Sequence, residues 1–122
     1  MTELQMGKIQ MRIMKILWER KKATAREITH DLNQIEPIAH STVQTLLRIL
    51  EQKGVVDHKA ENRTFIFYPT VKDKKVINNA MREFIDNVFT GSASSLVLYL
   101  VKNRYISTRE LSEISELLDK KE

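Results

Sequence analysis

The sequence of 122 residues lacks cysteine and contains only three glycines and two prolines. Without cysteine, the chain can build neither a disulfide framework nor a thiolate metal site. Its longest apolar run, LVLYLV at 96–101, is far shorter than the roughly 20 residues of a membrane span, and no signal-peptide pattern opens the chain. The scarcity of glycine and proline favours helices joined by short connections. We therefore expect a cytoplasmic protein without membrane contact.

Positive charge is only slightly in excess. The 20 Lys and Arg outweigh the 16 Asp and Glu to give a net charge of +4, and 42% of the residues are apolar. A chain of this length and composition is expected to fold as one domain or as two very small ones. Its charge permits binding to a polyanion such as DNA without requiring it, so composition alone does not separate the function classes.

The first half of the chain shows three helical patterns followed by a hairpin pattern. Apolar residues at helical spacing predict helices at about 8–19, 24–33 and 41–53. The second begins with the capping box TARE, with Thr24 as N-cap and Glu27 at N3, and Gly54 suits the C′ position after the third. Beta-branched and aromatic residues then predict strands near 55–59 and 63–68 around a polar turn at 60–62, where Asn62 suits a left-handed conformation.

The third predicted helix has two contrasting faces within the stretch STVQTLLRILEQK. Val43, Leu46, Leu47 and Leu50 follow the spacing of a buried stripe. The opposite face carries short hydroxyls, amides and one guanidinium, where an ordinary solvent face would carry many Lys and Glu. Its members are Ser41, Thr45, Arg48 and Gln52, with Gln44 beside them.

The order of three helices and a hairpin is that of a winged helix-turn-helix, whose third helix enters the DNA major groove. The polar face of helix 41–53 would then meet base edges and phosphates, and cations near the hairpin turn would meet the DNA backbone. The predicted DNA-contacting residues are Ser41, Gln44, Thr45 and Arg48 on the helix, His40 before it, and Lys59 and Arg63 beside the hairpin turn.

Other interpretations of these features stay open. Helix 41–53 is also compatible with an ordinary amphipathic helix, and the winged helix with a module that docks a protein and never meets DNA. Trp18, Phe65 and Phe67 are interpreted as core residues rather than base-stacking platforms. The three histidines show neither helical pairing nor a carboxylate cluster, so no metal site and no cofactor are expected. No phosphate loop, nucleophile motif or paired carboxylates in an evident pocket favour an enzyme.

The second half, 72–122, carries three helical patterns and is too short to build an adequate core by itself. A second capping box, STRE at 107–110, opens the last of them. Its apolar surface favours a homodimer that places two reading helices in successive major grooves of a palindromic operator. A monomer with these helices packed back on the winged helix is the alternative. The predicted dimerisation residues are Ile77, Met81, Phe84, Leu96, Leu98, Leu100, Leu111, Ile114 and Leu118.

Three segments resemble the penicillinase repressors of the BlaI and MecI type, over nearly the whole chain. They are IMKILWERKKATAREI, STVQTLLRILEQKGVV and GSASSLVLYLV. The resemblance implies a mainly α fold with a small β-hairpin, with a winged-helix DNA-binding domain at 1–71 and a helical dimerisation domain at 72–122. It implies a homodimeric transcriptional repressor of β-lactamase or related resistance genes. It also assigns Ser41, Thr42, Gln44, Thr45 and Arg48 to the DNA-facing side of the recognition helix.

The resemblance extends to regulation by proteolysis. In those repressors, a pathway that begins with a β-lactam-sensing membrane protease ends in cleavage of an Asn–Phe bond just after SLVL, which separates the dimer. The corresponding pair here is Tyr99–Leu100, so cleavage of this bond by a regulatory protease is a hypothesis that the resemblance suggests. Copper-responsive relatives instead use a cysteine-rich C-terminal motif. That mechanism is excluded here because the chain has no cysteine.

Overall fold

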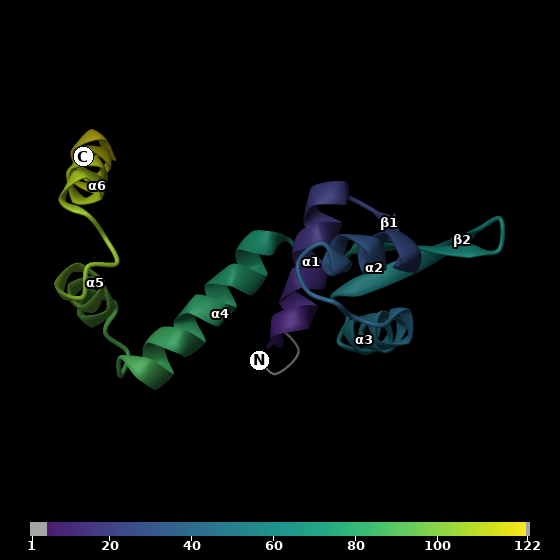
Figure 1. Cartoon of the computed structure of the whole chain (residues 1–122). Helices are drawn as coiled ribbons and strands as arrows, with labels where there is room; N and C mark the ends of the chain where they lie inside the picture. Colours follow the sequence, from purple (N-terminus) through teal and green to yellow (C-terminus); the bar gives the residue numbers. More distant parts are fainter. Residues whose placement is uncertain (1–4, 122) are drawn as a thin grey trace. The chain divides into compact units, whose positions relative to one another are not determined.

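The computed structural model describes residues 5–121, which form two compact units (Figure 1). The first unit ends at Met81 and the second begins at Arg82. Helix α4 (Asp73–Val88) therefore contributes to both units. The domain boundary expected at 71/72 precedes this helix, whereas the boundary between the two units falls within it. The early turns of α4, which include the buried Val76, belong to the first unit.

Three helices supply most of the first unit. They are α1 (Lys8–Arg20), α2 (Ala25–Asn33) and α3 (His40–Gln52). The capping box predicted for α2 is present, since Thr24 Oγ1 accepts from Glu27 N at 3.1 Å and Glu27 Oε1 accepts from Thr24 N at 2.9 Å. Gly54 follows α3 with a φ of 79°, the left-handed conformation that suits a C′ residue. The three helices predicted for this half are therefore confirmed.

A three-stranded antiparallel sheet completes the first unit, with the strand order β1-β3-β2. Its strands are β1 (Ala23–Thr24), β2 (Val56–Glu61) and β3 (Thr64–Pro69). β2 and β3 form the predicted hairpin, in which His58 pairs with Phe67. The turn lies later than predicted and consists of Asn62 and Arg63, both left-handed with φ of 50° and 68°. β1 is too short for any periodicity to predict it.

The core of the first unit is formed by the apolar faces of its helices and by one face of the sheet. Phe67 is buried as predicted. Trp18 is half-buried against the core and donates from Nε1 to the Val71 carbonyl at 3.0 Å. The prediction for Phe65 is wrong, because 51% of its surface is exposed. Phe65 shares a face with Phe67 but lies two residues nearer the turn. The turn end of the hairpin extends past the helices (Figure 1).

The second unit continues α4 and adds α5 (Ala93–Lys102) and α6 (Thr108–Lys121). Thr90 and Gly91, with φ of 47° and 83°, separate α4 from α5. The second predicted capping box is present, because Ser107 Oγ accepts from Glu110 N at 3.1 Å and Glu110 Oε1 accepts from Ser107 N at 3.0 Å. The hydrogen bond from the Ser107 backbone lowers the pKa of the Glu110 carboxyl.

Apolar side chains of the second unit are exposed or only half-buried. From Arg82 to Lys120, the stretch of this unit whose side chains are described, no residue is buried. Aromatic rings pack along this unit, with centroids 5.8 Å apart for Phe84 and Phe89 and for Phe89 and Tyr99. Within residues 5–121, no single helix is long and apolar enough to cross a membrane, although the bent pair α4 and α5 has that length and composition when taken together.

Candidate nucleic-acid interface

An open cleft of about 560 Å³ lies in the first unit between α3, the start of α2 and the β2–β3 hairpin, which we call the wing. On α3 the cleft is lined by a stripe at helical spacing, because residues three or four apart share one face. The charged, polar and aromatic side chains that line the cleft include Arg26 from α2, His40, Gln44, Arg48 and Glu51 from α3, and His58, Arg63 and Phe65 from the wing.

The predicted polar face of α3 points to solvent. Val43, Leu47 and Leu50 are buried on the opposite side of the helix. The exposed residues are Ser41, Thr42, Gln44, Thr45, Arg48 and Gln52, of which Gln44 and Arg48 line the cleft. Thr45 Oγ1 donates to the Ser41 carbonyl at 3.1 Å, so its acceptor lone pairs stay available. The structure therefore leaves hydroxyl, amide and guanidinium groups free to meet a ligand along this face.

His40 begins α3 and is half-buried in the cleft wall. Its Nδ1 lies 3.0 Å from Thr29 Oγ1, and this hydroxyl donates to the Ala25 carbonyl at 2.8 Å. Because a hydroxyl has one proton to donate, Nδ1 must be the donor in the contact with Thr29. The Nε2 atom of neutral His40 is then an acceptor for an external donor, and the contact also ties α2 to α3.

The two predicted cations of the wing lie on different sides of it. Arg63 is exposed in the turn and lines the cleft. Lys59 does not line the cleft, because successive residues of a strand point to opposite faces and His58 takes the cleft side. Its Nζ lies 5.9 Å from the centre of the Tyr68 ring, in a separate shallow surface with Lys21. The structure thus brings Arg63, but not Lys59, together with α3.

Arg26 is a cation of the cleft that the sequence analysis missed. It is exposed in the first turn of α2, and nothing in the amphipathic pattern distinguishes it from a solvated arginine. A possible signal is its place at the start of the helix that precedes the reading helix, because that helix crosses the DNA backbone in a helix-turn-helix. Within the described chain, Arg26, Arg48 and Arg63 form no ion pair.

Arg20 provides the contrast to these free cations. Its Nε lies 2.7 Å from Asp31 Oδ2 and its Nη2 lies 3.0 Å from Oδ1, a bidentate pair that joins α1 to α2. The hydrogen bond from Arg20 lowers the pKa of the Asp31 carboxyl. The guanidinium of Arg20 is therefore engaged within the protein, whereas the three arginines of the cleft are available to an anionic partner.

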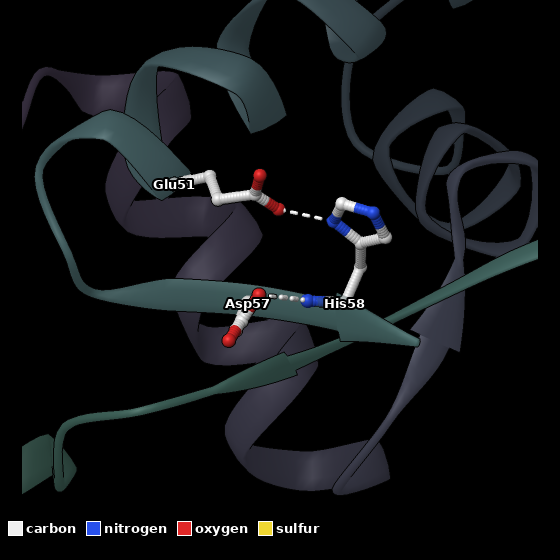
Figure 2. Close-up of side chains that lie close together, drawn as sticks. All are labelled: Glu51, Asp57 and His58. Carbon is white, nitrogen blue, oxygen red and sulfur yellow. Dashed lines mark hydrogen bonds and ion pairs between the residues drawn. The ribbon is translucent and has the colours of Figure 1, made fainter. Parts of the chain in front are cut away.

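Three side chains of types that can ligate a metal ion, Glu51, Asp57 and His58, lie close together where α3 ends and the wing begins (Figure 2). His58 Nδ1 contacts Glu51 Oε1, and Asp57 Oδ1 accepts from the His58 backbone N–H at 2.8 Å. Their ligand atoms all lie within 4.8 Å of one another. The prediction that no histidine has a carboxylate cluster is therefore wrong. Helical spacing could not reveal this cluster, because the chain reverses at Gly54 between Glu51 and the strand.

The predicted dimerisation residues of the second half are exposed or half-buried. Ile77, Met81, Phe84, Leu98, Ile114 and Leu118 are exposed, and Leu96, Leu100 and Leu111 are half-buried. The hypothetical cleavage pair, Tyr99–Leu100, lies inside α5, where the Tyr99 carbonyl accepts from Asn103 N and Asn103 Nδ2 at 3.0 Å each. A protease that needs an extended substrate must therefore first unwind this turn.

Comparison with known proteins agrees with this architecture. The sequence pattern described as "Penicillinase repressor" matches residues 6–120. The chain is 31% identical over 109 residues to the methicillin resistance regulatory protein MecI of Staphylococcus aureus strain N315, and the alignment covers 89% of each chain. It is 25% identical over 115 residues to the penicillinase repressor of Bacillus licheniformis, covering 94% of this chain and 90% of that relative.

A solved structure supports the same fold. The solution structure of the DNA-binding domain of the repressor BlaI is similar with a TM-score of 0.52 and 26% sequence identity, over 57% of this chain and 84% of that chain. The fold predicted from the sequence, mainly α with a small β-hairpin and an N-terminal winged helix-turn-helix, is therefore confirmed.

Proposed function

Because this chain belongs to the penicillinase repressor family and is a DNA-binding transcriptional repressor, we propose that it acts as a homodimer on a palindromic operator in double-stranded DNA. The family consists of transcriptional repressors rather than enzymes. One observation carries the proposal for the interface: Arg26, Arg48 and Arg63 converge on one cleft with the polar face of α3, and none forms an ion pair within the described chain. Free cations suit phosphates, and an exposed polar helix suits base edges.

The roles within this interface follow from side-chain chemistry. Gln44 and Arg48 line the cleft and carry the two groups that form bidentate contacts with adenine and guanine in the major groove. The hydroxyls of Ser41 and Thr42, which can donate or accept, serve bases or phosphates along the same helix, and Thr45 Oγ1 can accept from a base. Arg26 and Arg63 flank α3 and supply phosphate contacts, which hold the protein in register. His40, whose Nδ1 contacts Thr29 and leaves Nε2 to accept, supplies a further contact at the start of the helix.

Dimerisation would pair the second units of two chains. The exposed apolar side chains of α4, α5 and α6 support this proposal, because a monomeric protein rarely exposes so many together. A two-fold axis would repeat the interface of α3 one helical turn of DNA away and so demand a palindrome. Linking two half-sites raises affinity through effective concentration, which makes the second unit part of the DNA-binding mechanism.

Repression would end when the dimer is lost. We propose that a regulatory protease cleaves α5 at Tyr99–Leu100, which would separate α6 from the rest of the interface. The regulated genes are expected to include β-lactamase or related resistance genes, because the relatives are named as a methicillin resistance regulatory protein and a penicillinase repressor. Incubation with the activated protease should yield a fragment that ends at Tyr99; an intact chain would reject this bond as the switch.

The proposed function is tested by footprinting on the chain's own upstream region. Two protected stretches related by a dyad, centred about 10 bp or a multiple apart, are expected for a symmetric dimer. A duplex of the same length and scrambled sequence is the control at the same moderate salt. Equal binding to both duplexes would favour the alternative function, a winged helix that docks a protein. Protection of a single half-site would contradict the dimer but leave DNA binding intact.

A further inference from the structure

The cluster of Glu51, Asp57 and His58 combines the donors of a transition-metal site. Glu51 lies in the last turn of α3, whereas Asp57 and His58 lie on β2, so two elements of the fold contribute (Figure 2). One imidazole nitrogen and two carboxylates form a mixed donor set that suits borderline ions such as Zn²⁺. We propose that this cluster binds a divalent transition-metal ion where the reading helix meets the wing.

The spacing of the donor atoms supports binding to one ion. Zn²⁺ binds nitrogen and oxygen ligands at about 2.0–2.2 Å in tetrahedral geometry, so two ligands of the same ion lie roughly 3.4 Å apart. The donor atoms of the cluster lie within 4.8 Å of one another, so a bound ion would draw them closer together by side-chain rotation. An ion there would replace the direct contact between His58 Nδ1 and Glu51 Oε1. Water would complete the coordination from the open cleft.

The imidazole of His58 is held in place by groups outside the cluster. The Phe65 ring lies with its centroid 4.2 Å from that of His58, and the Phe67 ring lies 5.5 Å away. These contacts keep Nδ1 directed toward Glu51 and reduce the ordering that metal binding requires. They also give the half-exposed Phe65 a role that a core residue would not have.

Neither carboxylate of the cluster forms an ion pair with a lysine or arginine in the part of the chain that the structure describes. Within the described chain, no Lys or Arg nitrogen lies within 4.0 Å of Glu51 or Asp57. Lys53, only two residues from Glu51, instead donates to the Gln5 carbonyl at 2.7 Å and to Gln10 at 3.2 Å. No Lys or Arg of the described chain balances the two acidic groups, so a divalent cation would improve their local charge balance.

The location of the site links metal binding to the proposed function, on which this step rests. Glu51 and His58 line the same cleft as Arg48, so the negative charge of the cluster repels approaching DNA phosphates. A bound divalent ion would cancel that charge and tie the end of α3 to β2. Screening at about 0.1 M salt limits the electrostatic gain, and we expect operator affinity to rise roughly twofold to fivefold. The ion would then act as a corepressor.

The first experiment measures metal binding to the full chain without DNA. Calorimetric titration with ZnCl₂ should show one Zn²⁺ per chain, and MgCl₂ should show much weaker binding. Removal of a residue behind a metal ligand usually costs about 10–100-fold, so His58→Ala and Glu51→Gln, which remove ligands, should lower Zn²⁺ affinity at least ~100-fold. The matched controls His30→Ala and Glu61→Gln, which are exposed and outside the cluster, should bind like the wild type.

The variants also decide against the site. No Zn²⁺ binding by the wild type, or undiminished binding by Glu51→Gln and His58→Ala, would overturn the proposal. Circular dichroism identifies a variant that fails to fold. Because Glu51→Gln and Asp57→Asn keep side-chain shape, at least these two are expected to fold and test the ligands directly.

The second experiment measures operator affinity with Zn²⁺ and with a chelator. Zn²⁺ should tighten binding by the wild type and by Glu61→Gln but not by His58→Ala. Without metal, Glu51→Gln should bind the operator more tightly than the wild type, because it removes one repulsive charge. An unchanged affinity on addition of Zn²⁺ would overturn the corepressor role. The experiments distinguish failure of the proposed function from failure of the metal site. Zn²⁺ binding without a preference for the operator rejects the proposed function. A preference for the operator without Zn²⁺ binding rejects the metal site.

Discussion

The two units of the chain use similar amphipathic helices but cover them differently. In the first unit, the apolar stripes of α1, α2 and α3 reach full burial, as at Leu17 and Leu50. In the second unit, the described side chains from Arg82 to Lys120 include none that is buried. An apolar stripe at helical spacing therefore indicates that one face of the helix is buried by packing, but it does not show whether the same chain or another chain packs against it.

The largest expected effect comes from placing a charge in the apolar surface of the second unit. Leu98 is 56% exposed on α5, and Leu98→Glu would bury a charge in the proposed dimer. We expect monomers at micromolar concentration and a loss of operator affinity of roughly 10²–10⁴-fold, the gain that linkage provides. Sedimentation and gel-shift titration measure the two effects.

A polar position of the same helix provides the control for Leu98→Glu. Ser94 is exposed in the first turn of α5, so Ser94→Glu adds the same charge near the helix N-terminus and should leave dimerisation intact. If Leu98→Glu remains a dimer with unchanged operator affinity, the exposed apolar face of α5 is not the dimer contact.

A cavity in the first unit should act through stability instead. Leu50 is fully buried, and Leu50→Ala should lower the free energy of unfolding by about 2–5 kcal/mol, since the transfer and cavity terms add. Urea denaturation, followed through the transition in which the first unit unfolds, measures this change in free energy. Ile35, which is 60% exposed, provides the control, and Ile35→Ala should change stability by less than about 0.5 kcal/mol. Equal losses for the two variants would mean that burial in the first unit is not what stabilises it.

Sequence readout should reside in the first unit alone. Arg48→Ala should weaken operator binding by about 1–3 kcal/mol if Arg48 contacts a base, and should weaken binding to random DNA less. Arg109 is an exposed arginine of α6, and Arg109→Ala should leave both affinities unchanged. Gel-shift titrations on the two duplexes provide the comparison. Equal losses on operator and random DNA for Arg48→Ala would assign Arg48 to phosphate contact.

The smallest effect should separate the two faces of the wing. Arg63→Ala should weaken binding to all sequences alike and reduce the slope of log affinity against log salt by about one unit. Lys59→Ala should change that slope less, because Lys59 lies outside the cleft near the Tyr68 ring. A salt series on random DNA measures both slopes. Equal slopes for the two variants would show that DNA reaches both faces of the wing.

Local patterns predicted the elements of this fold well. Helical periodicity and the capping residues Thr24 and Ser107 are properties of short segments, so the sequence suffices to locate α2 and α6. The two-residue strand β1 carries no such pattern and becomes a strand only by pairing with β3. Phe65 shows the same limit, because an aromatic side chain suits a core, yet Phe65 lies near the turn of the hairpin and is half exposed.

The interface was predictable in part for the same reason. The exposed face of α3 follows from its own periodicity, and Gln44 and Arg48 were found from it. Arg26 and the contact between Glu51 and His58 depend on how separate elements approach one another, which a single sequence does not reveal. The side of the wing that each cation occupies depends on strand register, which the pairing of β2 with β3 sets.

The turn of the wing combines an unfavourable backbone with a useful charge. Two-residue hairpin turns with both central residues left-handed readily accept asparagine first and favour glycine second. Asn62 satisfies the first preference, but Arg63 occupies the second position with a φ of 68°. A side chain there costs about 1–2 kcal/mol relative to an ordinary conformation. The hairpin thus gives up some stability at its outermost point and gains a guanidinium at the end of its reach, where glycine would make a less strained turn with nothing to hold an anion.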